Sequence, residues 1–289
     1  MYIGIICEFD PLHSGHARLL SHARAMGADA VICAMSGNFT QRGSFAALDK
    51  RARAEMAVRC GADLVVELPT VWAMSPAETF ARGSVQLLAL TDVDTLLFGS
   101  ECGELSALRR LADCLDSPAF ADRLTAADSG ATFAVRRQRA AAALLGDADA
   151  ALLESPNNTL AVEYLRALRR TGASMTPATL LRTGAAHDGA PEGGTASASY
   201  LRQLLRQGQG EAACGFTPPE AADILRRELS HGRVTDSALC ERAILSRLRT
   251  MTEEEWRGYD PGGEGLYHRL YQAARSACTV EELLSAAKT

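Results

Sequence analysis

The chain has 289 residues, of which 47% are hydrophobic and 22% are charged, and its mean hydropathy is −0.04. These values are typical of a globular protein with one large domain or two ordinary ones. The first residues, MYIGIICEFD, are too short an apolar run for a signal peptide, and no stretch reaches the roughly 18 apolar residues of a membrane helix. We therefore expect a cytoplasmic protein. The net charge of −5 argues against a generally basic nucleic-acid-binding surface.

Eight cysteines are scattered along the chain, and no two of them form a C-x-x-C pair. A zinc site needs clustered ligands, and a disulfide framework is typical of secreted proteins. We therefore expect reduced, mostly buried thiols and no metal site built from protein ligands.

The first hundred residues alternate between two kinds of segment. Short apolar runs predict strands at residues 2–7, 29–37, 62–69 and 93–100. Apolar residues at helical spacing predict helices at residues 15–27, 47–61 and 77–91. This alternation is typical of right-handed βαβ units, so we expect an α/β, Rossmann-like parallel sheet with helices on both faces. Ligands of such sheets bind beyond the carboxyl ends of the strands.

The rest of the chain is mostly helical in pattern. The pattern predicts a helical insertion at residues 105–153, a capped helix at 155–172 and a further strand at 175–184. It then predicts a flexible glycine-rich loop at 184–197 and a helix that begins with serines at 197–208. The remainder predicts helices only. We therefore expect a first domain over residues 1–206 and a helical region over residues 207–289.

The loop after the first strand contains His13-Ser14-Gly15-His16. Glycine lets the backbone approach a ligand, and a helix that begins here presents free N–H groups and the positive end of its dipole. Imidazoles three residues apart add hydrogen-bond donors that stay bonded to a phosphate oxygen as a phosphoryl or adenylyl group is transferred. The pattern predicts nucleotidyl transfer, in which most of the catalysis is orientation and charge stabilisation. The alternative is two polar residues that cap an ordinary helix.

Three other residues leave a binding role and a structural role open. Glu67 and Glu101 sit at predicted strand ends, where either would orient a ribose or an attacking amine, or would serve the structure alone. Trp72 either stacks on a base or packs in the core.

The segment GIICEFDPLHSGH is similar to the H-x-G-H loop of the HIGH-type nucleotidyltransferases, and the chain resembles the bacterial tRNA(Met) cytidine acetate ligase family. The match runs in order through AMSGNFTQRG, DKRARAEMAVRCGADLVVELP, FARGSVQLL, FGSECGEL, PNNTLAVEYLRAL, LLRTGAAHD and SASYLRQLL, and covers most of residues 3–206. The resemblance implies a nucleotidyltransferase-like ATP-binding domain. It also implies a ligase that activates acetate with ATP as acetyl-adenylate and acetylates N4 of the wobble cytidine of elongator tRNA(Met).

The resemblance implies roles for individual residues. The expected catalytic residues are His13, His16 and Arg182. The expected contacts with acetate or cytidine are Ser36, Asn38 and Arg42. The expected contacts with ATP, which we expect to carry Mg²⁺ as its counter-ion, are Ile6, Cys7, Glu8, Phe9, Asp10, Pro11, Leu12, His13, Ser14, Gly15, His16, Ala17, Arg18, Leu19, Gly99, Asn157, Arg182, Ser197 and Ser199. We expect no DNA or membrane partner.

The segment SASYLR resembles the second phosphate-binding signature of this superfamily, through Ser197, Ser199 and Arg202. The glycine-rich run before it suits a mobile lid over the triphosphate. A plain serine N-cap is the alternative.

Two departures from the family pattern affect these expectations. The family reads E-Y-N-P-F-H-N-G-H, whereas this chain has Asp10 in place of the asparagine. A carboxylate near a polyphosphate predicts weaker ATP binding or a stronger need for Mg²⁺. The family also continues past Lys288-Thr289 into a basic segment, so we expect this short form to bind ATP but to hold tRNA weakly.

Two other functions stay open. A small-molecule adenylyl- or cytidylyltransferase that releases pyrophosphate shares the H-x-G-H loop and SASYLR, but not the blocks between them. A nucleotide-binding regulatory module without turnover is disfavoured because both histidines are present.

Overall fold

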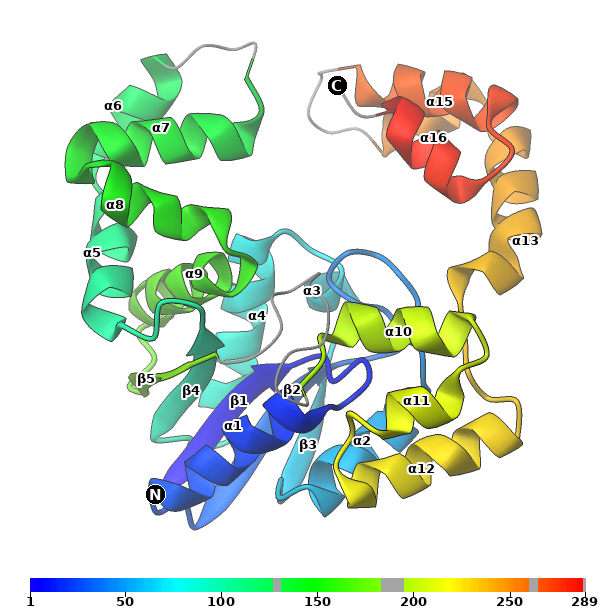
Figure 1. Ribbon diagram of the computed structural model, residues 1–289. Coiled ribbons are helices and arrows are strands. Elements are labelled where there is room, and N and C mark those ends of the chain that lie inside the picture. The colour runs from blue at the N-terminus through cyan, green and yellow to red at the C-terminus, as the bar shows by residue number, and fades with distance from the viewer. Residues whose placement is uncertain (127–130, 183–194, 260–264, 288–289) are drawn as a thin grey trace. The chain divides into compact units, whose positions relative to one another are not determined.

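The computed structural model describes residues 1–126, 131–182, 195–259 and 265–287. Five strands form one parallel sheet in the order β3-β2-β1-β4-β5 (Figure 1). They are β1 (Tyr2–Cys7), β2 (Ala30–Ser36), β3 (Leu64–Leu68), β4 (Thr95–Ser100) and β5 (Thr176–Leu181). The sequence predicted all five. Most of the predicted loop at 184–197 lies outside the described residues.

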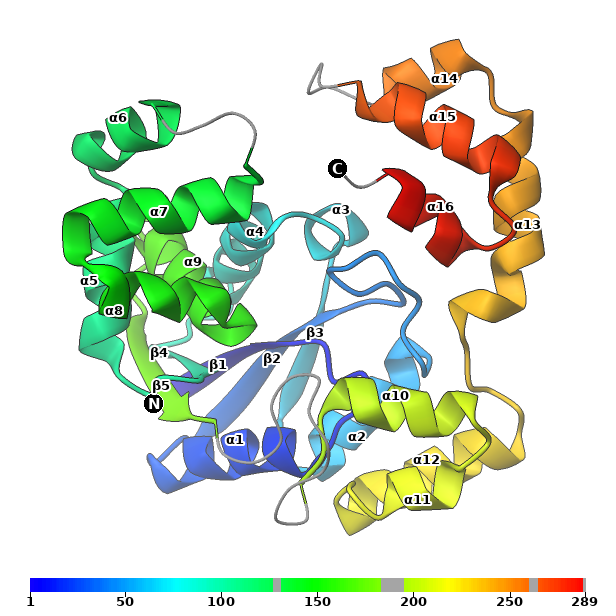
Figure 2. The same cartoon turned by 45° about the horizontal axis from the view of Figure 1, so that its top comes forward.

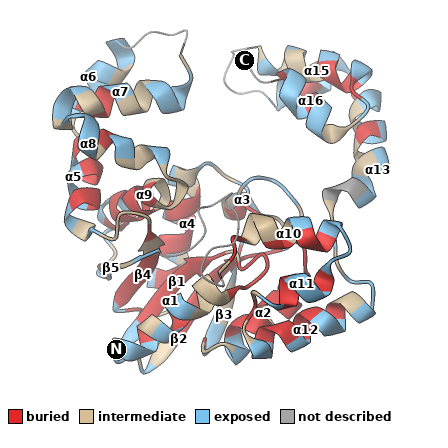
Figure 3. Ribbon diagram, viewed as in Figure 1, coloured by how far each residue is buried: buried red, intermediate tan, exposed pale blue. Residues whose placement is uncertain are grey.

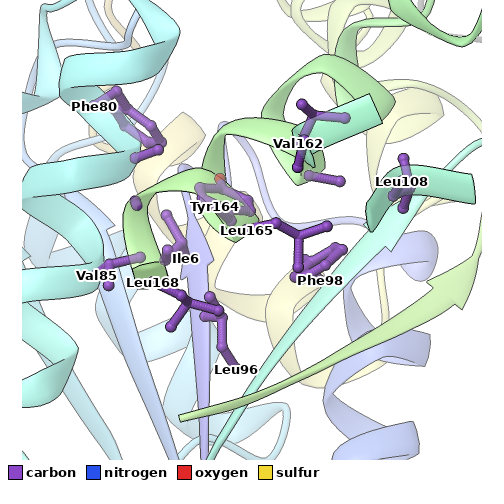
Figure 4. Packing of buried hydrophobic residues seen from close by; sticks show 14 of the residues in the cluster. Ile6, Phe80, Val85, Leu96, Phe98, Leu108, Val162, Tyr164, Leu165 and Leu168 are labelled. Atoms are coloured by element: carbon purple, nitrogen blue, oxygen red, sulfur yellow. The ribbon is translucent and has the colours of Figure 1, made fainter. Parts of the chain in front are cut away.

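One face of the sheet packs against α4 (Ala77–Ala89), α5 (Leu105–Leu115) and α9 (Pro156–Thr171). Side chains alternate along a strand, so Ile6 points to this face and its neighbour Ile5 to the other. Figure 4 shows Phe80 of α4 and Tyr164 of α9 close to Ile6 in this core. Buried residues follow the strands and the sheet-facing sides of these helices (Figure 3).

The opposite face packs against α1 (Ser14–Ala25), α2 (Lys50–Arg59), α10 (Ala198–Arg206), α11 (Gly210–Cys214) and α12 (Pro219–Ser230). Figure 2 shows these helices together on one side of the sheet. Their apolar residues share one cluster with Ile5 and Val31; Leu20, Met56, Leu204 and Ile224 are examples. Helices on both faces, as predicted, leave the strand ends as the polar edge of the sheet.

The predicted helical insertion follows α5. Its elements are α6 (Pro118–Ala126), α7 (Phe133–Leu145), α8 (Asp147–Ala150) and η1 (Ala151–Glu154). The buried carboxylate of Glu163 in α9 accepts hydrogen bonds from Arg137 of α7 and from Arg166. This ionic contact ties α7 to the helix that borders the sheet.

The chain divides into two compact units, residues 1–234 and 235–289. The second unit contains α13 (Ser237–Thr250), α14 (Glu253–Gly258), α15 (Leu266–Ser276) and α16 (Val280–Ala287), with Trp256, Ala274 and Leu283 in its own core. The boundary expected after residue 206 lies inside the first unit, because α11 and α12 pack in the same cluster as β1. None of the described helices has the length and apolar character needed to cross a membrane.

Candidate active site

A cavity of about 390 Å³ lies at the carboxyl ends of β1 and β4. The strand order reverses here, because β2 and β3 lie on one side of β1, and β4 and β5 on the other. β1 pairs with β4 only at Ile3 and Gly4, whereas it pairs with β2 from Tyr2 to Cys7. The end of β1 is therefore free of β4, and such a crevice is where sheets of this kind bind ligands.

Most of the expected site residues border this cavity. Those in its lining are Ile6, Cys7, Glu8, Phe9, Asp10, His13, His16, Leu19, Arg42, Gly99, Asn157, Arg182, Ser197 and Ser199. Those outside its lining are Pro11, Leu12, Ser14, Gly15, Ala17, Arg18, Ser36 and Asn38. Segments that are nearly 200 residues apart in the sequence thus meet at one site.

The two histidines of the H-x-G-H motif both cap α1 through their Nδ1 atoms. His13 is the N-cap residue, and its Nδ1 accepts a hydrogen bond from the N–H of Gly15 at 3.1 Å. Nδ1 of His16 accepts from the N–H of His13 at 3.4 Å, and the ring centroids are 3.8 Å apart. A neutral imidazole with Nδ1 as acceptor carries its proton on Nε2. The pair therefore caps the helix and still offers two Nε2–H donors.

The pKa of each histidine is lowered, so both are neutral at pH 7. Burial is the main cause for His13, and the nearby Arg182 and Arg202 add to it, which lowers the pKa to about 4. Burial also lowers the pKa of His16, with a further contribution from His13. The histidines thus present hydrogen-bond donors without competing with the arginines as cations.

The neutral His13 predicts a loss of stability in acid. Its folded-state pKa of about 4 lies below the ordinary value of 6.5. Its contribution to stability is therefore complete above about pH 6.5 and is lost as the pH falls towards 4. The lowered pKa corresponds to a loss on the order of 3 kcal/mol. Urea unfolding between pH 4 and pH 7 measures this loss.

His13→Asn is the matched variant for this measurement, because asparagine keeps a side-chain acceptor for the N–H of Gly15. Glu8 and Asp10 also have shifted pKa values, raised by burial, but they titrate in both proteins. The difference between wild type and variant therefore reports His13 together with its effect on the pKa of His16. We expect the wild type to lose more stability on acidification, and parallel pH profiles would contradict the prediction.

Glycine is needed at position 15 because of His13 itself. A Cβ on Gly15 would lie 2.9 Å from Cε1 of His13, so a side chain would displace the capping ring. Gly99 at the end of β4 has a similar role, since a Cβ there would lie 3.1 Å from Cγ of Arg182. The side chain of Arg182 thus lies over Gly99. The expected contact of Gly99 with a nucleotide stays a prediction.

Two carboxylates connect the loop after β1 to the loop after β2. Oε1 of Glu8 accepts from the N–H of Gln41 at 2.6 Å, and Oδ1 of Asp10 accepts from the N–H of Ala47 at 2.6 Å. Nη1 of Arg202 donates to the backbone oxygen of Asp10 at 2.8 Å and lies 3.6 Å from Oδ2. The carboxylate that replaces the family's asparagine therefore faces an arginine of α10. The expected effect of Asp10 on ATP binding stays a prediction.

Arg53 is fully buried in α2 and was not predicted from the sequence. Its guanidinium donates to four backbone carbonyls: those of Glu8, Ser36, Gly37 and Leu48. These carbonyls belong to the last residue of β2 and to the loops that follow β1 and β2. Arg53 therefore holds together two loops that border the cavity. The available signal was helical spacing, because Arg53 shares a face with the buried Met56 and Ala57.

Asn157 borders the cavity at the start of α9 and is held by Glu101. Nδ2 of Asn157 donates to Oε1 of Glu101 at 2.6 Å, and the N–H of Asn158 donates to Oε2 at 2.8 Å. The N-cap residue Ser155 makes no side-chain cap bond, so Glu101 supplies the acceptors that this helix end needs. These contacts favour the structural role for Glu101.

Glu67 and Trp72 also have structural partners. Oε2 of Glu67 lies 2.6 Å from Nζ of Lys50. Trp72, in the short helix α3 (Thr70–Ala73), packs so closely on Gly83 that a Cβ there would lie 2.4 Å from its ring. Neither Glu67 nor Trp72 lines the cavity. The structural role is favoured for both.

The three residues expected to contact acetate or cytidine lie in different surroundings. Ser36 is fully buried, and its hydroxyl has no hydrogen-bond partner among the described residues. Oδ1 of Asn38 accepts from the N–H of Lys50 at 2.9 Å. Arg42 borders the cavity, unlike Ser36 and Asn38. The three substrate assignments stay predictions.

Ser197 and Ser199 line the cavity at the start of α10. Oγ of Ser197 accepts from the N–H of Tyr200 at 3.2 Å and lies 2.9 Å from Oγ of Ser199. Ser197 is therefore the N-cap residue of α10, and its hydroxyl borders the cavity as well. Within the described part of the chain, no three His, Cys, Asp or Glu side chains are placed to hold a metal ion.

The fold and the cavity define a HIGH-type nucleotidyl transferase, and the family model described as HIGH Nucleotidyl Transferase matches residues 1–289. The chain is 43% identical to the tRNA(Met) cytidine acetate ligase of Syntrophotalea carbinolica and 38% identical to that of Syntrophomonas wolfei. These matches cover 85% and 97% of this chain, but 60% and 70% of the two relatives. The chain belongs to the tRNA(Met) cytidine acetate ligase family.

Two crystal structures of Thermotoga maritima TmcAL are similar to the whole of this chain. The apo structure, form I, has a TM-score of 0.94 and 32% identity, and 71% of it is covered. The structure bound with alpha-thio ATP has a TM-score of 0.91 and 31% identity, and 70% of it is covered. The predicted α/β fold with a helical C-terminal part is confirmed.

Proposed function

We propose that this chain is a cytoplasmic, ATP-dependent tRNA(Met) cytidine acetate ligase. It activates acetate as acetyl-adenylate and transfers the acetyl group to N4 of the wobble cytidine of elongator tRNA(Met). The observation that carries the proposal is the neutral histidine pair, His13 and His16, at the start of α1 and beside the crevice between β1 and β4. The 38% identity to a tRNA(Met) cytidine acetate ligase over 97% of the chain supports the choice of substrates.

In the first half-reaction, a carboxylate oxygen of acetate forms a bond to the α-phosphorus of ATP, and the bond to pyrophosphate breaks. Negative charge shifts onto the phosphate oxygens in the transition state. The Nε2–H groups of His13 and His16, the free N–H groups of α1 and the cation of Arg182 are the proposed donors for that charge. Mg²⁺ enters in this proposal as the counter-ion of ATP.

In the second half-reaction, N4 of cytidine forms a bond to the acetyl carbon, and the carbon–oxygen bond to AMP breaks. AMP takes the electron pair of the broken bond, and N4 loses one proton. The loop after β2, which includes Gln41 and Arg42, borders the same cavity. We propose that this loop meets the cytidine, because β4, Gly99 and Arg182 border the other side.

ATP–pyrophosphate exchange with different acids tests the first half-reaction. We expect exchange with acetate, less with propionate, and none with glycerol 3-phosphate. Labelled acetate should then enter a tRNA(Met) transcript, but not a transcript with uridine at the wobble position. Exchange that requires glycerol 3-phosphate would instead identify a small-molecule nucleotidyltransferase. Failure to exchange with any acid would contradict both functions.

A further inference from the structure

The second half-reaction releases a proton from N4 of cytidine, and a base in the cavity must receive it. This question rests on the proposed function. The described cavity-lining side chains that we consider as proton acceptors are His13, His16, Cys7, Tyr164, Asp10 and Glu8. A side chain can receive the proton only if one of its basic atoms carries no proton and accepts no other hydrogen bond.

The two histidines are poor candidates because Nδ1 of each already accepts a backbone N–H at the start of α1, and Nε2 carries the proton. Burial raises the pKa of the Cys7 thiol and of the Tyr164 hydroxyl, so both stay protonated. None of these four side chains offers a vacant basic atom at neutral pH.

Asp10 is also committed to the structure. Its Oδ1 accepts from the N–H of Ala47, and its Oδ2 is buried at 3.6 Å from Nη1 of Arg202. The side chain is only 2% exposed. A proton on Asp10 would weaken the ionic contact with Arg202, and the cytidine has little access to this carboxylate.

Glu8 differs from Asp10 in one respect. Its Oε1 accepts from the N–H of Gln41 at 2.6 Å, but its Oε2 has no hydrogen-bond partner among the described residues. Glu8 follows β1 directly and lines the cavity together with Gln41 and Arg42 of the loop after β2. Its carboxylate therefore borders the cavity beside that loop.

We propose that the carboxylate of Glu8 accepts the proton that N4 of cytidine loses as the amine attacks acetyl-adenylate. The nitrogen–carbon bond forms and the carbon–oxygen bond to AMP breaks, with the electron pair leaving on the phosphate oxygen of AMP. The proton passes to Oε2 of Glu8 and then to water. Gln41 holds the other oxygen, which fixes the direction of the vacant one.

The surroundings of Glu8 suit this role. Burial is the largest effect and raises its pKa above the ordinary 4.5, and the charge of Asp10 adds to the increase. The N–H of Gln41, Arg202 of α10 and Arg53 of α2 act in the opposite direction. A carboxylate with a raised pKa is a stronger base, which favours general-base catalysis.

Glu8→Gln tests the proposal, because the amide keeps an oxygen for the N–H of Gln41 and loses the base. The two half-reactions are measured separately: acetate-dependent exchange without tRNA, and single-turnover transfer from preformed acetyl-adenylate to a tRNA(Met) transcript, from pH 5 to pH 9. We expect transfer to fall by at least about 100-fold and exchange by much less. The acidic limb of the transfer profile should also disappear.

Two further variants and the wild type separate the outcomes. Glu8→Asp should restore part of the transfer rate and the acidic limb, and Asp10→Asn should retain that limb. Equal losses of exchange and transfer in Glu8→Gln, or a retained acidic limb, would overturn the proposal. Glu8 would then have a structural role in the site. Absence of acetate-dependent exchange in the wild type would instead overturn the proposed function.

Discussion

His16→Ala is expected to lower acetate-dependent ATP–pyrophosphate exchange by roughly 10²- to 10⁴-fold, with the fold intact. The variant removes one Nε2–H donor from the cavity. It also removes the acceptor of the N–H of His13, a hydrogen bond of 3.4 Å. The N–H of Gly15 still donates to Nδ1 of His13, so the helix keeps its principal cap bond. The measurement is the initial rate of exchange at saturating ATP.

His22→Ala is the matched control, since His22 lies on the same helix but does not line the cavity. We expect this control to exchange at the wild-type rate. Circular dichroism and thermal unfolding show whether both variants fold. Full exchange by a folded His16→Ala would mean that the H-x-G-H motif of this chain serves only to cap α1.

Arg53→Met is expected to destabilise the first unit by about 3 kcal/mol and to weaken ATP binding by more than tenfold. Methionine fills a similar volume but leaves four carbonyls without their donor. A buried acceptor that loses its partner costs about 1–3 kcal/mol, and part of the loss is recovered by rearrangement. The loops after β1 and β2 would then move apart. Hydrogen exchange of the β1 and β2 amides and ATP titration measure the two effects.

Arg51→Met is the control for Arg53→Met, because Arg51 is an exposed arginine of the same helix. Its replacement is expected to change stability by less than about 0.5 kcal/mol. Arg53→Lys should fall between the two, since an ammonium group can serve fewer of the four carbonyls. Equal stability of Arg53→Met and Arg51→Met would show that Arg53 does not hold the two loops together.

Much of the fold could be predicted because the strands and longer helices have clear local patterns. Ile5 and Ile6 point to opposite faces of a sheet that is buried on both, so β1 reads as a continuous apolar run. The single turn α3 has too few residues for a period. The division after Val234 depends on what α11 and α12 contact, which is a property of tertiary packing and not of their own residues.

The place of His13 and His16 at the cavity could be predicted from their spacing at the start of a helix, and their catalytic role stays a prediction. The site could not be predicted where an ordinary surface residue type is buried. Arg51, Arg53 and Arg59 all lie in one helix, and only Arg53 is buried under two loops. Glu101 likewise caps α9 only because this helix begins beside it in space. Asn157, whose N–H and Nδ2 donate to Glu101, lies 56 residues later in the chain.

His13 caps α1 and is also proposed to act in catalysis, and this combination has a consequence for descendants of this protein. A lineage that no longer needs catalysis is free to lose the Nε2–H groups, but the N–H of Gly15 still needs an acceptor. Asn, Asp and Ser supply one, whereas Ala or Val would cost about 1 kcal/mol of helix stability. Drift at His13 should therefore be biased towards short polar side chains. Relatives that have lost the activity should therefore have Asn, Asp or Ser at position 13 more often than Ala or Val.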